Sequence, residues 1–327
     1  MNIYDIAKEA GVSIATVSRL LNNSGYVGEK TKIKIQKVLD KHDYTPSPIA
    51  KGMVSKSMKT IAVITVDIRV PSHASTAYMI EQDFTKKGYN VVVCNTGGNL
   101  ENTMKYIKLM RERLVDGFIF VGSIFNTICK NIDIIKAIGK LPVVLANGQL
   151  DIPNSYSVLV DDGGGIKLMT RYLYEKGYDS IAYVKDLDTD SAKNKTKAFL
   201  EIMKQVGVKE PNEDVFLASY GIDGGRQVMK NIIDSSKKYN AVVFGEDLTA
   251  TGGMQELWTR KMEIPKDMAI TGYNNSEYAM ICNMTSVDNK EGLLGKLSVE
   301  LLEDLILGKE IMASMIIQPE LVIRETT

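Results

Sequence analysis

Arg19 and several hydroxyl side chains in the first twenty residues have chemistry that suits the surface of a nucleic acid. An arginine guanidinium can donate two parallel hydrogen bonds to O6 and N7 of guanine, or it can hold a phosphate alone, and both possibilities are open for Arg19. Hydroxyl groups suit contacts that position a protein on the phosphate backbone without reading bases. The hydroxyl-bearing candidates are Tyr4, Ser13, Thr16 and Ser18. Ile14 and Ala15 have no hydrogen-bonding tips, so they could read only methyl groups or shape.

Two short helices are predicted to position these side chains. The apolar residues of the first helix recur at helical spacing: Ile3, Ile6, Ala7 and Ala10. Gly11 tolerates the positive φ of a tight turn, and Ser13 is a candidate cap for a second helix that starts at Ser13 or Ile14. The residues of that helix expected to pack inward are Ala15, Val17, Ser18 and Leu21, with Ile14, Thr16 and Arg19 nearer the outside. The pattern fits a helix-turn-helix DNA reader and, from periodicity alone, an ordinary pair of packed helices equally well.

Charge is distributed unevenly along a chain that is neutral as a whole. Residues 1–59 hold ten Lys or Arg and five Asp or Glu, which leaves 30 basic and 35 acidic side chains in residues 60–327. A basic head on an acidic body suits a phosphate-binding module joined to a domain that does not touch DNA. With 327 residues, 44% hydrophobic and 24% charged, the chain has the composition of a globular protein of two or three domains.

Cysteines, histidines and the N-terminus give little sign of catalysis, metal binding or export. Cys94, Cys129 and Cys282 are widely spaced in apolar runs, which favours reduced, buried thiols in the cytoplasm. The early charges exclude a signal peptide, and no apolar run approaches the ~18 residues that a membrane helix needs. The sequence has no HExxH, GxSxG or CxxC motif, and its two histidines are His42 and His73. We therefore expect a cytoplasmic protein that is not an enzyme and that needs no cofactor or metal.

The stretch YDIAKEAGVSIATVSRLLN, residues 4–22, resembles the N-terminal signature of the LacI/GalR family of bacterial transcription regulators nearly position for position. The resemblance implies that Ile14, Ala15 and Arg19 face the DNA major groove. A third helix over residues 31–41 would complete the headpiece, and YTP at 44–46 is similar to the motif that ends this helix in the family.

The segment SPIAKGMVSK, residues 47–56, matches the hinge of the family, which becomes a short helix when two copies meet over the DNA minor groove. Its expected DNA contacts are Ala50, Lys51 and Met53, with Met53 where most relatives carry a Leu wedge. Pro48 and Gly52 are poor in an isolated helix, which favours order only on binding. The alternative for this segment is a plain interdomain linker.

From residue 60 onward, short apolar runs alternate with amphipathic stretches. Strands are predicted at 61–66, 90–95, 116–122, 142–147, 156–161, 180–185, 215–220, 241–246, 268–273 and 313–323. Helices are predicted near 75–87, 101–114, 126–139, 165–176, 192–206, 223–234, 249–260 and 290–307. The predicted fold is an α/β protein: a three-helix helix-turn-helix headpiece (1–46), a hinge (47–59) and a periplasmic-binding-protein-like core (60–327) of two doubly wound parallel lobes. The first lobe is expected at about 60–160 and 290–327, and the second at about 161–289.

The resemblance places an effector in the cleft between the lobes and identifies candidate contacts there. The candidates are Ser72, His73, Asn147, Lys195, Glu246 and Asn274, with Asp247 also expected at a strand end facing the cleft. The family's Asn-Pro-Phe-aromatic run reads Val-Pro-Ser-His at 70–73, so the aromatic that stacks on a sugar is missing. Lys195 stands where many members have arginine, and Asn274 replaces a carboxylate. These departures indicate either a small polar effector other than a plain hexose or a pocket that has lapsed.

Two further features of the core are ordinary in this family. The glycines at 163–165 lack the rest of a phosphate-loop motif, and Asp161 or Asp162 is expected to cap the helix that starts there. Some members respond to a phosphorylated carrier protein through basic residues on the last helix, but the matching stretch, 300–304, is acidic.

The predicted function is therefore a repressor that binds pseudo-palindromic operator DNA as a homodimer, under the control of a small polar, carbohydrate-like effector. The alternatives are a cytosolic solute-binding protein, an enzyme built on the core, and a regulator with a lapsed pocket that is controlled by a protein partner.

Overall fold

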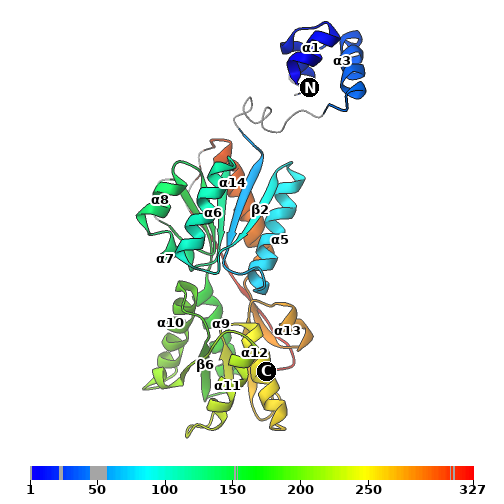
Figure 1. The fold of residues 1–327 in the computed structure, drawn as a ribbon. Helices are drawn as coiled ribbons and strands as arrows, with labels where there is room; N and C mark the ends of the chain where they lie inside the picture. Colours follow the sequence, from blue (N-terminus) through cyan, green and yellow to red (C-terminus); the bar gives the residue numbers. More distant parts are fainter. Residues whose placement is uncertain are drawn as a thin grey trace. The chain divides into compact units, whose positions relative to one another are not determined.

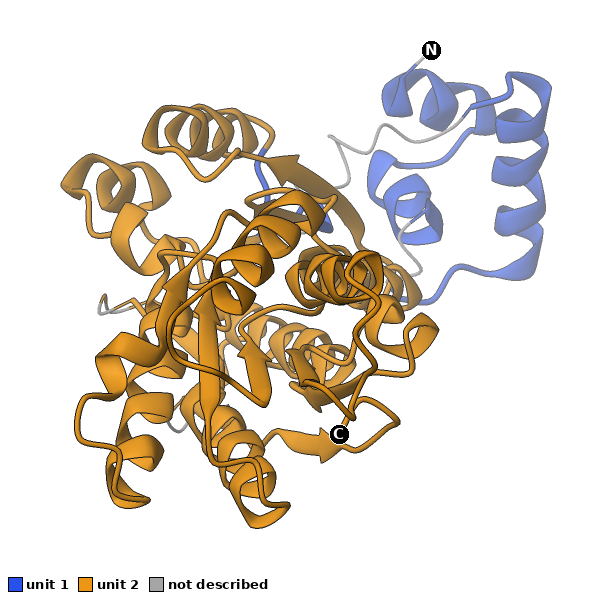
Figure 2. Ribbon diagram, turned by 90° about the horizontal axis from the view of Figure 1, so that it is seen from below, with its two compact units in different colours: residues 1–60, 114–116 blue, residues 61–113, 117–327 orange. Residues whose placement is uncertain are grey.

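A computed structural model describes residues 2–21, 25–44, 57–150, 152, 154–309, 311 and 314–327. The chain forms two compact units, residues 1–60 with 114–116 and residues 61–113 with 117–327 (Figure 2). The first unit contains the predicted headpiece, and the second contains both predicted lobes of the core. Ala50, Lys51 and Met53 lie outside the described residues, so their expected role at the minor groove stays a prediction.

The headpiece has three helices: α1 (Ile3–Ala10), α2 (Ile14–Leu21) and α3 (Glu29–Lys41) (Figure 1). Asn2 begins α1 with a capping box, because its side chain accepts from the backbone of Tyr4 and Asp5 while Asp5 accepts from the backbone of Asn2. Gly11 ends α1 at a φ of 67°, the left-handed conformation predicted for this turn. The Ser13 hydroxyl caps α2 by accepting from the backbone N–H of Thr16 at 3.2 Å, as expected.

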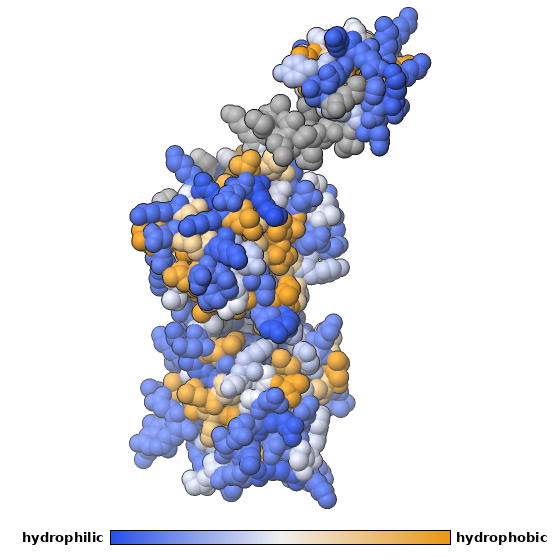
Figure 3. Space-filling view, viewed as in Figure 1, coloured by the Kyte–Doolittle hydropathy of each residue, from blue (hydrophilic) through white to orange (hydrophobic). Residues whose placement is uncertain are grey.

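A small apolar core holds the three helices together. Its buried members are Ile6, Ala7, Ala10, Val17, Ile35, Val38 and Leu39. Glu9 on α1 also links α1 to the end of α3, because its carboxylate lies 2.7 Å from Lys41 Nζ and 2.8 Å from His42 Nε2. In the view of Figure 3 the surface of the headpiece is mostly hydrophilic.

The predicted inward packing of Ala15 is wrong, because Ala15 is exposed. Val17 is the buried residue of α2, and a residue two positions away lies roughly 200° around a helix of 3.6 residues per turn. Ala15 therefore faces the opposite side from the core, whereas Ser18 and Leu21 are half-buried toward it.

The first lobe of the core is a six-stranded sheet in the order β11-β5-β4-β3-β1-β2. Its strands are β1 (Thr60–Thr65), β2 (Asn90–Asn95), β3 (Gly117–Val121), β4 (Val143–Ala146), β5 (Ser155–Val160) and β11 (Met315–Ile317). Its helices are α5 (Pro71–Lys86), α6 (Leu100–Glu112), α7 (Phe125–Ile128), α8 (Ile132–Ile138) and α14 (Glu291–Ile306). Helices α5 and α14 pack together over the inner strands, and every residue of β3 and β4 is buried, as a doubly covered parallel sheet requires.

The second lobe repeats this plan with a sheet in the order β12-β10-β9-β8-β6-β7. Its strands are β6 (Ile181–Lys185), β7 (Val215–Leu217), β8 (Ala241–Phe244), β9 (Ala269–Tyr273), β10 (Thr285–Asp288) and β12 (Glu320–Val322). Its helices are α9 (Asp162–Glu175), α10 (Asp190–Gln205), the 3₁₀ turn η1 (Pro211–Asp214), α11 (Ile222–Ile233), α12 (Asp247–Thr259) and α13 (Glu277–Ile281). Helices α9 and α10 cover one face, and α11 and α12 cover the other.

The end of the chain differs from the prediction of one strand over 313–323 in the first lobe. It forms two short strands, β11 and β12, with Pro319 between them, where a residue without an N–H interrupts pairing. β11 joins the first sheet, but β12 pairs antiparallel with β10 in the second sheet. The expected placement of residues 290–327 in the first lobe is therefore wrong for β12, which belongs to the second sheet.

Smaller differences concern local breaks in the chain. The helix predicted near 126–139 is divided into α7 and α8 by Asn131, whose side chain caps α8 by accepting from the Asp133 N–H at 2.9 Å. The prediction missed β10 and α13. Cys94, Cys129 and Cys282 are free; the first two are buried, as expected, and Cys282 is half-buried. Within the described residues, no helix has the length and apolar character needed to span a bilayer.

Replacing Gly11 by Ala is expected to destabilise the headpiece by about 1–2 kcal/mol, because a Cβ disfavours the left-handed conformation. Crowding would not contribute, since no described atom beyond its chain neighbours lies within 4 Å of a Cβ built there. Gly11→Asn is the matched control with a smaller loss, because Asn tolerates this conformation. Amide hydrogen exchange of Val17 and Ile35 in the full chain would measure the effect. Equal protection in the Ala variant and the parent would contradict it.

Candidate functional site

The first candidate site is the surface of α1 and α2 around Arg19. Arg19 and Ala15 are exposed, Ile14 is 41% exposed and Tyr4 is 65% exposed. The Arg19 guanidinium has no hydrogen-bond or salt-bridge partner among the described residues, so its donors are available to another molecule. The structure thus presents the three predicted groove-facing residues, Ile14, Ala15 and Arg19, on the outside of α2.

The hydroxyl residues of this surface are less free than the sequence suggests. Ser13 Oγ and Thr16 Oγ1 lie 2.8 Å apart and share a hydrogen bond at the start of α2. Thr16 and Ser18 are half-buried, whereas Ser13 is exposed. Ser13 and Thr16 therefore stabilise the beginning of α2; the Ser13 hydroxyl retains capacity for one further hydrogen bond and the Thr16 hydroxyl for two.

The second candidate site is a cavity of about 360 Å³ between the two lobes of the core. Its lining includes all six residues predicted from the sequence: Ser72, His73, Asn147, Lys195, Glu246 and Asn274. Ser72 and His73 come from the first turn of α5, and Asn147 follows β4. Lys195 lies on α10, Glu246 follows β8 and Asn274 follows β9. The residues lie together because the carboxyl ends of the strands in both open sheets face the cavity.

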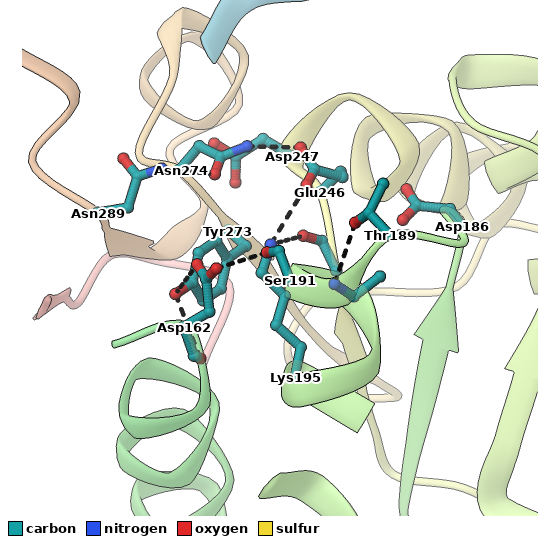
Figure 4. A network of polar contacts seen from close by, with 12 residues as sticks. Asp162, Asp186, Thr189, Ser191, Lys195, Glu246, Asp247, Tyr273, Asn274 and Asn289 are labelled. Carbon is teal, nitrogen blue, oxygen red and sulfur yellow. Dashed lines mark hydrogen bonds and ion pairs between the residues drawn. The ribbon is translucent and has the colours of Figure 1, made fainter. Parts of the chain in front are cut away.

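Lys195 is the centre of a polar network in the cavity wall (Figure 4). Its ammonium is buried, donates to the Gly245 carbonyl at 3.0 Å and lies 3.2 Å from Glu246 Oε1. It also lies 3.6 Å from the centre of the Tyr273 ring, within range of a cation–π contact. Burial disfavours the charge on Lys195, but the nearby carboxylates outweigh it and raise its pKa above the usual value. Lys195 is thus held as a cation.

Glu246 orients two asparagine side chains through a chain of hydrogen bonds. Asn274 Nδ2 donates to Glu246 Oε2 at 2.5 Å, and Asn274 Oδ1 accepts from Asn289 Nδ2 at 3.0 Å. Asn274 has a φ of 100°, a left-handed backbone that asparagine tolerates better than most residues. Asn274, which replaces a carboxylate of the family pattern, therefore also fits the backbone conformation of this loop.

Asp161 and Asp162 have different roles at the start of α9. Asp161 caps the helix by accepting from the Gly164 N–H at 2.8 Å, as predicted. Asp162 is turned into the cavity wall, where it accepts from Ser191 Oγ at 2.5 Å, Asn147 Nδ2 at 3.2 Å and Tyr273 OH at 3.0 Å.

The prediction that Asp247 faces the cleft is wrong. Asp247 is 1% exposed and does not belong to the lining of the cavity that the structure describes. Its carboxylate accepts from Ser276 N and Oγ at 2.8 Å each and from Ser286 Oγ at 2.7 Å. Asp247 therefore organises the loop after β9 from behind the cavity wall.

Comparisons with known proteins agree with this architecture. Residues 2–47 match the family described as bacterial regulatory proteins, lacI family, and residues 170–327 match the periplasmic binding protein-like domain. An HTH-type transcriptional regulator of Lachnoclostridium phytofermentans is 32% identical over 331 residues, covering 100% of this chain and 99% of the relative.

This chain belongs to the lacI family. Its members are transcriptional regulators, so the expectation that the chain is a DNA-binding regulator and not an enzyme is confirmed by its relatives.

Solved structures share the fold of this lacI-family chain over its whole length. A lac repressor dimer bound to operator and the anti-inducer ONPF has a TM-score of 0.86 at 21% identity, covering 100% of this chain and 98% of that one. A complex of the transcriptional regulator CelR with cellobiose has a TM-score of 0.73 at 21% identity and covers 100% of both chains. At these identities the likeness concerns the fold.

The cavity lining includes residues that the lacI-family pattern did not identify. Among them are Asp186 and Tyr220 from the second lobe, Asn289 from the passage between β10 and α14, and Glu291 at the start of α14. Burial and the charge of Glu246 raise the pKa of Asp186 to about 7. Tyr220 brings an aromatic side chain to a cleft whose usual aromatic run is absent at 70–73. Asp186 directly follows a predicted strand, so its position was a signal that could have been used.

Lys195→Met is expected to lower the free energy of unfolding of the core by about 3–5 kcal/mol, because it leaves Glu246 as a buried carboxylate without its cation. Adding Glu246→Gln to this variant should recover much of the loss. Lys193→Met on the same helix is the control, since Lys193 is half-exposed and its nearest carboxylate oxygens are 3.8 and 3.9 Å away. Chemical unfolding followed by tryptophan fluorescence would test this. A double variant that is no more stable than Lys195→Met alone would contradict the pairing.

Proposed function

We propose that this lacI-family regulator is a cytoplasmic repressor that binds a pseudo-palindromic operator as a homodimer. Two headpieces would lie on half-sites that are related by the two-fold axis of the dimer. The observation that carries the proposal is Arg19, exposed on α2 with Ile14 and Ala15 beside it. A guanidinium without a hydrogen-bond or salt-bridge partner in the described part of the chain, on the outer face of a helix-turn-helix, suits bidentate reading of guanine.

The other proposed DNA contacts have two roles: some position the headpiece on the phosphate backbone, and others bind the minor groove. Tyr4, Ser13, Thr16 and Ser18 would contact the phosphate backbone. Ala50 and Lys51 would lie along the minor groove, and Met53 would enter between base pairs and bend the duplex. Unstacking a base step costs a few kcal/mol. We therefore expect the hinge helix to form only where two copies of the segment meet on the DNA.

A small polar effector in the interlobe cavity would control the repressor. Support comes from residues of both lobes that meet beside the cavity: Asn126 Nδ2 donates to Asp190 Oδ2 at 3.0 Å, and the Ser191 N–H donates to Ser123 Oγ at 3.2 Å. A ligand that prefers one arrangement of the lobes would shift the population toward it. The size of the cavity and the polar side chains that converge in its lining favour a working pocket over a lapsed one.

Replacing Arg19 by Ala should weaken binding to the operator by about 1–3 kcal/mol, since the bidentate contact with a guanine would be lost. Binding to a scrambled duplex should fall much less, because a single phosphate contact contributes little. Arg19→Lys should resemble the Ala variant on the operator, since Lys keeps the charge and loses the planar fork. Operators chosen by selection of bound oligonucleotides, followed by fluorescence anisotropy at several salt concentrations, would provide the measurement.

Lys34→Ala, an exposed change near the start of α3, is the control and should not alter the preference for the operator. Equal losses on operator and scrambled DNA for the Arg19 variants would make Arg19 a phosphate contact. Selected sites without two-fold symmetry would argue against the dimer.

A further inference from the structure

Carboxyl groups outnumber ammonium groups in the wall of the interlobe cavity. The carboxyl residues that line it are Asp162, Asp186, Asp188, Glu246 and Glu291, and the lysines are Lys185 and Lys195. His73 also lines the cavity, but burial lowers its pKa, so its ring is neutral near pH 7. The described lining therefore has an excess of potential negative charge that it does not balance itself.

Both lysines are already paired with carboxylates. Lys195 holds Glu246, and Lys185 Nζ lies 3.0 Å from Asp188, whose side chain is 78% exposed at the rim. Asp162 is satisfied by hydrogen bonds from neutral groups, and Asp186 accepts from Thr249 Oγ1. Glu291 remains without a cation among the described lining residues.

The passage between β10 and α14 supplies two buried acceptor atoms without partners. Asn289 is 6% exposed; its Nδ2 donates to Asn274, which fixes the amide so that Oδ1 is the free atom. No hydrogen-bond partner for Asn289 Oδ1 or Glu291 Oε1 exists among the described residues. A buried polar atom without a partner costs about 1–3 kcal/mol, so a ligand that donates to these atoms gains affinity. Both atoms are hydrogen-bond acceptors, and one of them belongs to a carboxyl group.

We propose that the effector of this site is a small polyhydroxylated amine whose primary ammonium group is received by Asn289 Oδ1 and Glu291 Oε1. The inference rests on the proposed function only in calling the ligand an effector. An ammonium group has three donors and no acceptor, and it supplies the positive charge that the wall lacks. Hydroxyl groups on the same ligand suit the neutral donors and acceptors elsewhere in the lining, such as Ser72 and Asn147. Phosphorylated or carboxylated ligands would add negative charge to a wall that already has an excess.

The titration of Glu291 gives this proposal a second readout. Burial raises the pKa of Glu291 to about 7; hydrogen bonds from Ser75 and Asn289 to its carboxyl group oppose this rise, and the charges of Glu246 and Asp247 add to it. An arriving ammonium would favour the ionised carboxylate, so binding near pH 6 would release a proton. The charges of Glu246 and Asp247 act on Glu291, and the other charged and titratable groups that line the same cavity are His73 on α5, Lys195 on α10, Lys185, Asp162, Asp186 and Asp188.

Titration calorimetry on the full chain with matched sugars tests the proposal. Each set contains an amino sugar, its N-acetyl form and the parent sugar: glucosamine, galactosamine and mannosamine with their counterparts, and with glucose 6-phosphate as an anionic probe. At least one amino sugar should bind about tenfold or more tightly than both of its counterparts. The same titration near pH 6 in two buffers of different ionisation enthalpy should show proton release. A parent sugar, N-acetyl sugar or phosphate that binds as tightly as the amines would overturn the proposal, as would failure of every amine to bind.

Substitutions in the full chain then test where the ammonium group of the ligand binds. Glu291→Gln should reduce the affinity for the amine about tenfold and abolish proton release, while it leaves the affinity for neutral sugars unchanged. Glu300→Gln, an exposed change on the same helix, is the matched control and should alter neither. An amine preference that survives Glu291→Gln would overturn this assignment of the site.

Operator binding by the same preparations separates the two proposals. Loss of the amine preference with specific DNA binding intact would remove the inference about the ligand alone. Amine binding without any specific DNA binding would remove the proposed repressor alone.

Discussion

The buried ammonium of Lys195 is the charge on which the order of the cavity depends. It sits against Glu246 and over the ring of Tyr273, and without it Glu246 would be a buried anion that is costly to keep. Glu246 in turn holds Asn274, and Asn274 holds Asn289. These side chains come from α10, the ends of β8 and β9, and the passage after β10, so one charge orients groups that are distant in the sequence.

The topology of the two sheets explains why those groups meet. In an open parallel sheet, the loops at the carboxyl ends of the strands form the crevice in which ligands bind. The chain crosses between the lobes after β5, after β10 and between β11 and β12. Asp162 lies directly after the first crossing, and Asn289 and Glu291 lie on the second. Residues that border the cavity are thus also residues at which the lobes are joined.

Much of this arrangement was predictable because buried parallel strands are visible as apolar runs whose ends can be read directly. The fully buried strand Gly117–Val121 lies within one residue of its predicted bounds of 116–122, and all six predicted cleft residues line the cavity. Asp247 could not be separated from Glu246 in this way, because adjacent residues at the start of a helix point in different directions. Glu291 was missed because it follows β10, a four-residue strand, and β12 was misplaced because its pairing with β10 joins residues far apart in the chain.

The placement of Asn289 and Glu291 where the chain passes from β10 to α14, between the lobes, bears on how a ligand could act. A ligand shifts an equilibrium only to the extent that it binds one state better than the other. Asn289 is oriented through Asn274 and Glu246 of the second lobe, while Glu291 begins α14, which packs on the sheet of the first lobe. A group that must contact both is sensitive to the relative position of the lobes. Its binding energy therefore depends on their arrangement, and that dependence is the physical requirement for an effector.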